Sequence, residues 1–123
     1  MPNGILIVDD NPSVRSLIRA QLAVSGLTVC GEAVDGLDAI KKTSILNPDL
    51  IVLDVSMPRM NGLDAALELH KVHPATPIVL NTLHAGVIRD GVALPDSVTD
   101  VVAKSENLAE RVCPCFTRSD DFS

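Results

Sequence analysis

At residues 50–54 the chain reads Leu50-Ile51-Val52-Leu53-Asp54, four apolar residues that run directly into a carboxylate. Apolar side chains at successive positions are typical of a strand buried on both faces, and such strands belong to parallel sheets covered by helices. Short runs of the same character, rich in β-branched residues, recur at residues 5–8, 27–30, 78–80 and 98–102. The sequence therefore predicts five short parallel strands.

Helix signals lie between these runs. Asn11-Pro12 offers an N-cap followed by proline at the first helical position, and Gly26 supplies a stop. Further helix signals cover residues 37–44 and 63–67, a weak glycine-containing segment at 85–94, and a short segment at 105–112. Strands that alternate with helices in this way predict an α/β fold, a doubly wound five-stranded parallel sheet with helices on both faces. At about 150 residues per domain, 123 residues make one domain.

Composition excludes several classes of function. Ten Lys and Arg residues against sixteen Asp and Glu residues give a net charge of −6, which argues against direct nucleic-acid binding by this chain. No apolar run approaches the roughly 20 residues of a membrane helix, so no membrane association is expected. The N-terminus, at residues 1–4, lacks the pattern of a signal peptide, and a cytoplasmic location is the expectation.

Polar residues follow the predicted strands at the points where each strand ends. Asp9 and Asp10 follow the first run, Asp54 ends the third, Thr82 follows the fourth and Lys104 follows the fifth. Ligands of open α/β sheets bind at the carboxyl ends of the strands. Three carboxylates, a hydroxyl and an ammonium are therefore expected at one edge of the sheet.

Three carboxylates held this close repel one another. Two like charges 4 Å apart cost roughly 4 kcal/mol at an effective dielectric constant of about 20, so cations must neutralise them. Lys104 supplies one positive charge, and a divalent metal is the natural second. A site with oxygen ligands alone favours Mg²⁺, which commonly shares its coordination shell with phosphate. The sequence thus predicts a place to hold a phosphoryl group.

These elements, taken in order, resemble the receiver domain of two-component response regulators. The residues that carry the resemblance are Ile5-Leu-Ile-Val-Asp9-Asp10-Asn-Pro12, the stretch from Pro48 through Asp54 and Met57-Pro58 to Gly62, Leu80-Asn-Thr82, and Lys104. It spans about residues 4–112. Residues 29–33 and 61–65 are similar to receivers that precede a helix-turn-helix DNA-binding domain. The resemblance implies a flavodoxin-like strand order of 2-1-3-4-5 and a receiver domain over residues 1–113. Residues 114–123 are polar, and a frayed C-terminal tail is expected there.

The resemblance also implies a role for each site residue. Asp54 would be the phosphoacceptor, and Asp10, Asp54 and the backbone carbonyl of Ser56 would bind Mg²⁺, with Asp9 acting mainly through a bound water. Lys104 would pair with the phosphoryl oxygens, and Thr82 would hydrogen-bond them. The chain would accept its phosphoryl group from a histidine kinase or phosphotransfer protein, and signal to an output domain or partner protein. It would be a switch rather than an enzyme.

Taken singly, these residues have simpler explanations. The Asp9-Asp10 pair can cap a helix, and Asp54 can be a turn residue. An aspartyl-phosphate phosphatase of the haloacid-dehalogenase type would need a second Asp where Ser56 stands. A flavin-binding module would need a phosphate-binding loop after the first strand, where the two carboxylates would repel a phosphate in the absence of a metal.

Two positions depart from the family pattern. Val101 stands where receivers usually carry an aromatic residue, and Ser105 follows Lys104 where proline is usual. A cis bond before Ser105 would cost roughly 3–4 kcal/mol, so a trans bond is expected. Both departures lie at the surface through which receivers usually signal to their partners. A pseudo-receiver, which binds partners without being phosphorylated, therefore remains an alternative.

Overall fold

The computed structural model describes residues 4–57, 60–83, 85–86, 88, 93–104 and 106–112. Along the chain its elements are β1 (Ile5–Val8), α1 (Pro12–Val24), β2 (Val29–Ala33), α2 (Gly36–Leu46), β3 (Leu50–Asp54), α3 (Gly62–Val72), β4 (Ile78–Thr82) and β5 (Val98–Ala103). The five strands form one sheet in the order β2-β1-β3-β4-β5, and every neighbouring pair is parallel. The predicted fold class and strand order are confirmed.

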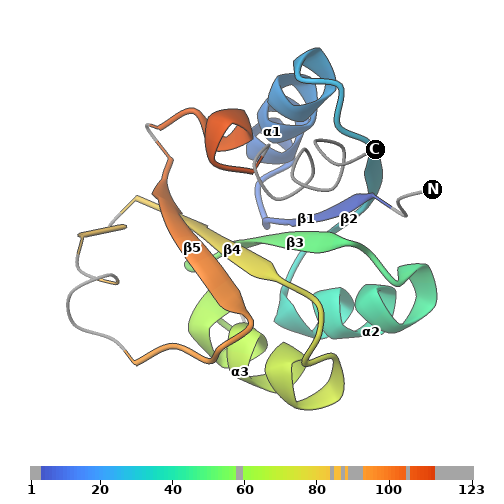
Figure 1. The fold of residues 1–123 in the computed structure, drawn as a ribbon, viewed down its shortest axis with the longest axis vertical. Coiled ribbons are helices and arrows are strands. Elements are labelled where there is room, and N and C mark those ends of the chain that lie inside the picture. The colour runs from blue at the N-terminus through green and yellow to red at the C-terminus, as the bar shows by residue number, and fades with distance from the viewer. Residues whose placement is uncertain are drawn as a thin grey trace, which may run out of the picture.

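Helices cover both faces of the sheet, as Figure 1 shows: α2 and α3 lie on one side, and α1 and the helical residues 108–112 lie on the other. Alternate residues of each strand serve the two sides. In β3, Ile51 and Leu53 pack with α2 and α3, while Leu50 and Val52 pack with α1 and residues 108–112. This double burial explains why the central strands are apolar at every position.

The helices begin at the polar residues expected of N-caps. The side chain of Asn11 accepts hydrogen bonds from the backbone amides of Ser13 and Val14 at the start of α1. Asp35 caps α2 and Asn61 caps α3 in the same way. Such side chains satisfy amides that have no partner inside the helix. The caps therefore fix where each helix starts, directly beside the strand ends.

The second strand differs from the sequence prediction. It covers Val29–Ala33 rather than residues 27–30, and four of its five residues are only half-buried. It lies at the edge of the sheet and pairs with β1 alone. A half-buried edge strand needs no continuous apolar run, so Gly31 and Glu32 are accommodated within it.

Several predictions concern residues outside the described ranges. Ala85, Gly86 and Ile88 are helical, but residues 87 and 89–92 of the weak segment at 85–94 are not described, and residues 93–95 are not helical. Ser105 and the tail at 114–123 also lie outside the described residues, so the domain boundary stays a prediction. Within the described part, none of the helices has the length and apolar character needed to cross a membrane. The cytoplasmic location stays a prediction.

Candidate functional site

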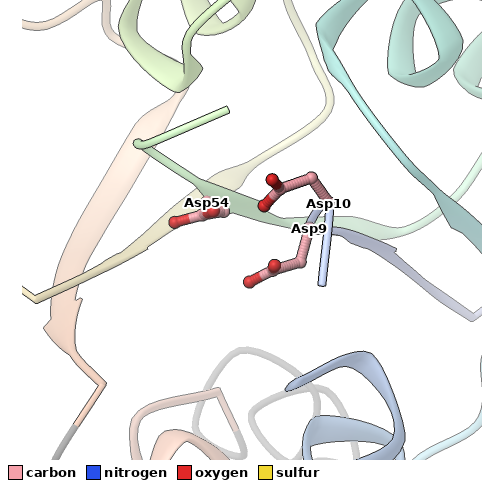
Figure 2. A group of neighbouring side chains, drawn as sticks. All are labelled: Asp9, Asp10 and Asp54. Carbon is pink, nitrogen blue, oxygen red and sulfur yellow. The ribbon is translucent and has the colours of Figure 1, made fainter. Parts of the chain in front are cut away.

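Three carboxylates meet at the carboxyl end of the sheet (Figure 2). Asp9 and Asp10 follow β1, and Asp54 ends β3, which pairs directly with β1. One oxygen from each carboxylate lies within 4.8 Å of the others. Asp9 and Asp54 are 1% and 3% exposed, whereas Asp10 is exposed to solvent. The structure thus brings together the three acidic residues that the sequence placed at this edge.

Lys104 reaches the same cluster from β5. Its Nζ lies 3.1 Å from Oδ2 of Asp9 and 3.2 Å from Oδ1 of Asp54. The backbone amide of Lys104 donates a hydrogen bond of 2.8 Å to the carbonyl of Thr82, which fixes the lysine beside the end of β4. One cation therefore bridges the two buried carboxylates.

The electrostatics of the cluster follow from this burial. Burial raises the pKa of Asp54, and the neighbouring charge of Asp9 raises it further, although Lys104 and the Ser56 amide act in the opposite direction. Burial alone would lower the pKa of Lys104, but its hydrogen bond to Asp9 and the charge of Asp54 outweigh that effect and raise it. The lysine is therefore a cation at neutral pH, while the charge of Asp54 remains incompletely compensated.

The loop after β1 is held by backbone contacts. The amide of Asn11 donates a 2.9 Å hydrogen bond to Oδ1 of Asp9, and Nη1 of Arg15 donates one of 2.7 Å to the Asp9 carbonyl. Arg15 also forms an ion pair of 2.8 Å with Glu32 on β2. Sequence reasoning did not find Arg15. The signal available in the sequence was the position of Arg15 on the first turn of α1, just after Asp9 and Asp10.

Gly62 allows the loop after β3 to close against the phosphoacceptor candidate. Its amide donates a 2.7 Å hydrogen bond to the carbonyl of Val55. A Cβ added at Gly62 would lie 2.1 Å from the carbonyl oxygen of Asp54 and 2.6 Å from the Cα of Val55. Both obstacles are backbone atoms, so only glycine fits. The sequence showed Gly62 in the motif, but not the reason for it.

The other site residues lie at this edge as well. The amide of Ser56 is 3.3 Å from Oδ1 of Asp54, and Ser56 itself is exposed. Thr82 is buried at the end of β4. The metal-binding role of the Ser56 carbonyl and the phosphate-binding role of the Thr82 hydroxyl stay predictions.

The donor set suits a hard divalent cation. The carboxylate oxygens of Asp9, Asp10 and Asp54 are close enough to bind one ion. Lys104 balances a single negative charge of the three. Oxygen ligands and residual negative charge are what Mg²⁺ prefers, and a partly exposed site lets it keep several of its waters. The residues present therefore fit Mg²⁺.

Comparison with known proteins identifies the family. Residues 5–112 match the model of the response regulator receiver domain, and the chain belongs to this family. It is the receiver domain of a response regulator, a phosphoacceptor that acts as a signalling switch in two-component systems. The resemblance drawn from the sequence is confirmed, and the comparisons do not favour the phosphatase, the flavin-binding module or the pseudo-receiver.

Two individual proteins illustrate this similarity. The chain is 38% identical over 80 residues to the chemotaxis protein CheY of Thermotoga maritima, covering 65% of this chain and 67% of CheY. It is also 38% identical over 105 residues to a protein-glutamate methylesterase/protein-glutamine glutaminase of Rhizobium etli, covering 84% of this chain but 30% of that protein. The chain thus spans less than a third of the methylesterase.

Solved structures show the same fold. The response regulator TrrA of Thermotoga maritima, determined in complex with Mg²⁺-BeF, is 33% identical with a TM-score of 0.80, covering 91% of this chain and 97% of TrrA. The chemotaxis protein CheY4 of Vibrio cholerae is 26% identical with a TM-score of 0.71, covering 93% and 95% of the two chains.

Proposed function

We propose that Asp54 is the phosphoacceptor of this receiver. The observation that carries the proposal is the setting of its carboxylate: buried at the end of β3, within 4.8 Å of two other carboxylates and 3.2 Å from an ammonium. A carboxylate in this setting is kept from bulk water and is poised beside the charges that phosphoryl transfer requires. Phosphoryl transfer depends on positioning and charge neutralisation more than on covalent help from the protein.

The reaction that fits this site is transfer from a phosphohistidine. A carboxylate oxygen of Asp54 forms a bond to phosphorus, the P–N bond of the donor breaks, and the electron pair returns to the imidazole nitrogen, which later takes a proton from solvent. Lys104 would follow the charge onto the phosphoryl oxygens, because its ammonium already touches Asp54. Thr82 would donate a hydrogen bond to one of these oxygens.

Asp9, Asp10, Asp54 and the Ser56 carbonyl would hold Mg²⁺, with Asp9 acting through a bound water. When bound, the ion would neutralise negative charge on the phosphoryl group. The fit of the acidic cluster supports this assignment, as does the Mg²⁺-BeF complex of the related TrrA protein. The phosphoryl donor would be a histidine kinase or phosphotransfer protein, and the output would pass to an attached domain or a partner protein. With a net charge of −6, this chain would not contact nucleic acid directly.

Intact mass measured after incubation with acetyl phosphate and Mg²⁺ tests the proposal. One phosphoryl group should be added to the wild type and none to Asp54→Asn, because an amide cannot attack phosphorus. Asp10→Asn should slow labelling and weaken Mg²⁺ binding, since it removes a hard anionic ligand. Lys104→Ala should keep Mg²⁺ binding but label poorly.

Asp64→Asn is the matched control. Asp64 is an exposed carboxylate on the first turn of α3, outside the cluster, and its variant should label at the wild-type rate. Full labelling of Asp54→Asn would contradict the proposal, and so would a wild type that accepts phosphate from neither acetyl phosphate nor any histidine kinase.

A further inference from the structure

Asn81 is a polar side chain buried beside the phosphoacceptor candidate. It lies in β4, is 4% exposed, and its Oδ1 has no hydrogen-bond partner within the part of the chain that the structure describes. In the register of the sheet Asn81 stands opposite Asp54 on one side and Val102 on the other. An unpaired acceptor in a buried place costs free energy, and such a group needs an explanation.

Strand alternation places Asn81 on the same face as the acidic cluster. Leu53 and its partner Leu80 both pack with α2 and α3, so the next residues, Asp54 and Asn81, face the opposite side. Val102, the other partner of Asn81, packs on that opposite side as well. The amide of Asn81 therefore belongs to the face that carries Asp54.

The side chain of Lys104 must cross β4 to reach its partners. Lys104 follows β5, whereas Asp54 and Asp9 belong to β3 and the end of β1, and β4 lies between β5 and β3. The hydrogen bond from the Lys104 amide to Thr82 sets the start of this crossing at the end of β4. Asn81 is the residue of β4 that faces the crossing side at that level.

The ammonium has one proton more than these contacts use. It carries three N–H bonds, and its recorded partners among the described residues are the carboxylates of Asp9 and Asp54. The ammonium of Lys104 and Oδ1 of Asn81, which has no partner among the described residues, thus lie on the same face of the sheet. We propose that Asn81 is a positioning residue for Lys104: Oδ1 of Asn81, which has no partner among the described residues in this state, accepts an N–H of the ammonium when Lys104 shifts toward the phosphoryl group.

The proposal rests on the proposed function of Asp54 and adds a residue to it. Phosphoryl transfer places new negative charge beside Asp54, and Lys104 must shift toward that charge without losing its alignment. Asn81 offers a neutral acceptor that does not compete for the metal. An amide is suited to this task, because a fourth carboxylate would add to the repulsion already present.

Asn81→Leu removes the acceptor while keeping the branched shape of the side chain. It should slow labelling by acetyl phosphate about tenfold, the scale of a lost hydrogen bond to a charged group. The Mg²⁺ dissociation constant from calorimetry should be unchanged, because Asn81 is not a metal ligand. Asn81→Thr, which restores an oxygen, should lie between wild type and Asn81→Leu.

A double-mutant cycle separates positioning from general packing. In the Lys104→Ala background, Asn81→Leu should change the labelling rate less than about twofold, because there is no ammonium to position. An equal slowing in both backgrounds would overturn the proposal, and so would wild-type labelling by Asn81→Leu.

Solvent exchange of the Lys104 ammonium protons, followed by ¹⁵N NMR in the presence of Mg²⁺ and beryllofluoride, gives a readout that needs no phosphoryl transfer. Exchange should be faster in Asn81→Leu than in wild type and Asn81→Thr. Equal exchange in all three proteins would refute the role of Asn81. If the wild type takes no phosphoryl group, the proposed function fails, while this exchange measurement still decides the Asn81 proposal.

Discussion

Two ion clusters use β5, and they differ in almost every physical respect. At the end of the strand, Lys104 bridges Asp9 and Asp54, whose side chains are 1% and 3% exposed. In the middle of the strand, Asp100 pairs with Arg111, which also binds Glu106, and all three side chains are about a third exposed. In the first cluster one cation contacts two buried carboxylates. In the second, one cation contacts two carboxylates that are partly exposed to solvent.

The two clusters also differ in the geometry of their ion pairs. Arg111 binds Asp100 through two nitrogens, with Nε 2.9 Å from Oδ2 and Nη2 2.6 Å from Oδ1. The Arg111 cluster is thus well paired, and its aspartate and glutamate raise the pKa of the guanidinium. In the Lys104 cluster, burial and Asp9 raise the pKa of Asp54 instead. An ion cluster built for stability pairs its charges, whereas one built for chemistry leaves negative charge to be met by a ligand.

Gly62→Ala should cause the largest loss of stability, because its new Cβ would clash with backbone atoms of Asp54 and Val55 beside the Lys104 cluster. The new Cβ would meet the carbonyl of Asp54 at 2.1 Å, and the loop after β3 would have to move. Chemical denaturation should show a loss of about 3 kcal/mol, the scale of a severe overpacking, together with slower phosphorylation.

Gly86→Ala is the control for this substitution. A Cβ at Gly86 would meet nothing within 4 Å, and its backbone is helical, so the variant should be neutral or slightly stabilising. Equal losses of stability in the two variants would mean that the close approach at Gly62 is not a constraint.

Removing the cation should destabilise the Lys104 cluster more than the Arg111 cluster. Lys104→Met keeps the apolar stem but leaves two buried carboxylates without a counterion, and should cost about 2 kcal/mol at neutral pH. Arg111→Met removes a cation that is about a third exposed and should cost about 0.5 kcal/mol. Urea denaturation measures both losses, and added Mg²⁺ should restore much of the first and none of the second. A larger loss of stability for Arg111→Met than for Lys104→Met would contradict the distinction between the two clusters.

Asp54→Asn should change the stability less than Lys104→Met does, with a characteristic pH dependence. Burial and the charge of Asp9 raise the pKa of Asp54 in the folded protein above its ordinary value, so the folded state holds this proton more tightly than the unfolded state. Ionisation of Asp54 therefore lowers wild-type stability as pH rises above about 4. The asparagine variant does not ionise at this position, so it should be more stable than the wild type at neutral pH.

Urea denaturation of wild type and Asp54→Asn between about pH 4 and pH 7, without divalent metal, measures this difference. The gap in free energy of unfolding should widen with rising pH. A gap that narrows over this range would mean that Asp54 is stabilised, not destabilised, by its surroundings.

The central strands and most of the site were predictable from sequence, because short local stretches of the chain carry the signals for them. Each central strand is buried on both faces, so Leu50 to Leu53 read as one apolar run, and Asp54 marks where the run meets the site. Parallel pairing then brings the strand ends together without any knowledge of side-chain packing. The positions of Asp9, Asp10 and Lys104 follow from topology alone.

What sequence could not supply depends on contacts between distant elements. The bounds of β2 were missed because an edge strand needs only one neighbour and tolerates Gly31 and Glu32. The role of Arg15 depends on an approach to the carbonyl of Asp9 that no local pattern encodes. Asn81 follows an apolar run as an ordinary strand-end residue would, and only the register of the sheet shows that it stands beside Asp54.

Reductive trapping of the phosphorylated protein identifies the residue that carries the phosphoryl group. Borohydride converts an aspartyl phosphate to homoserine, and peptide mass spectrometry then locates the modified residue. We expect a single homoserine at position 54, formed only after incubation with acetyl phosphate and Mg²⁺. Homoserine at position 9 or 10, or phosphate that remains on a serine or threonine under the same conditions, would contradict it.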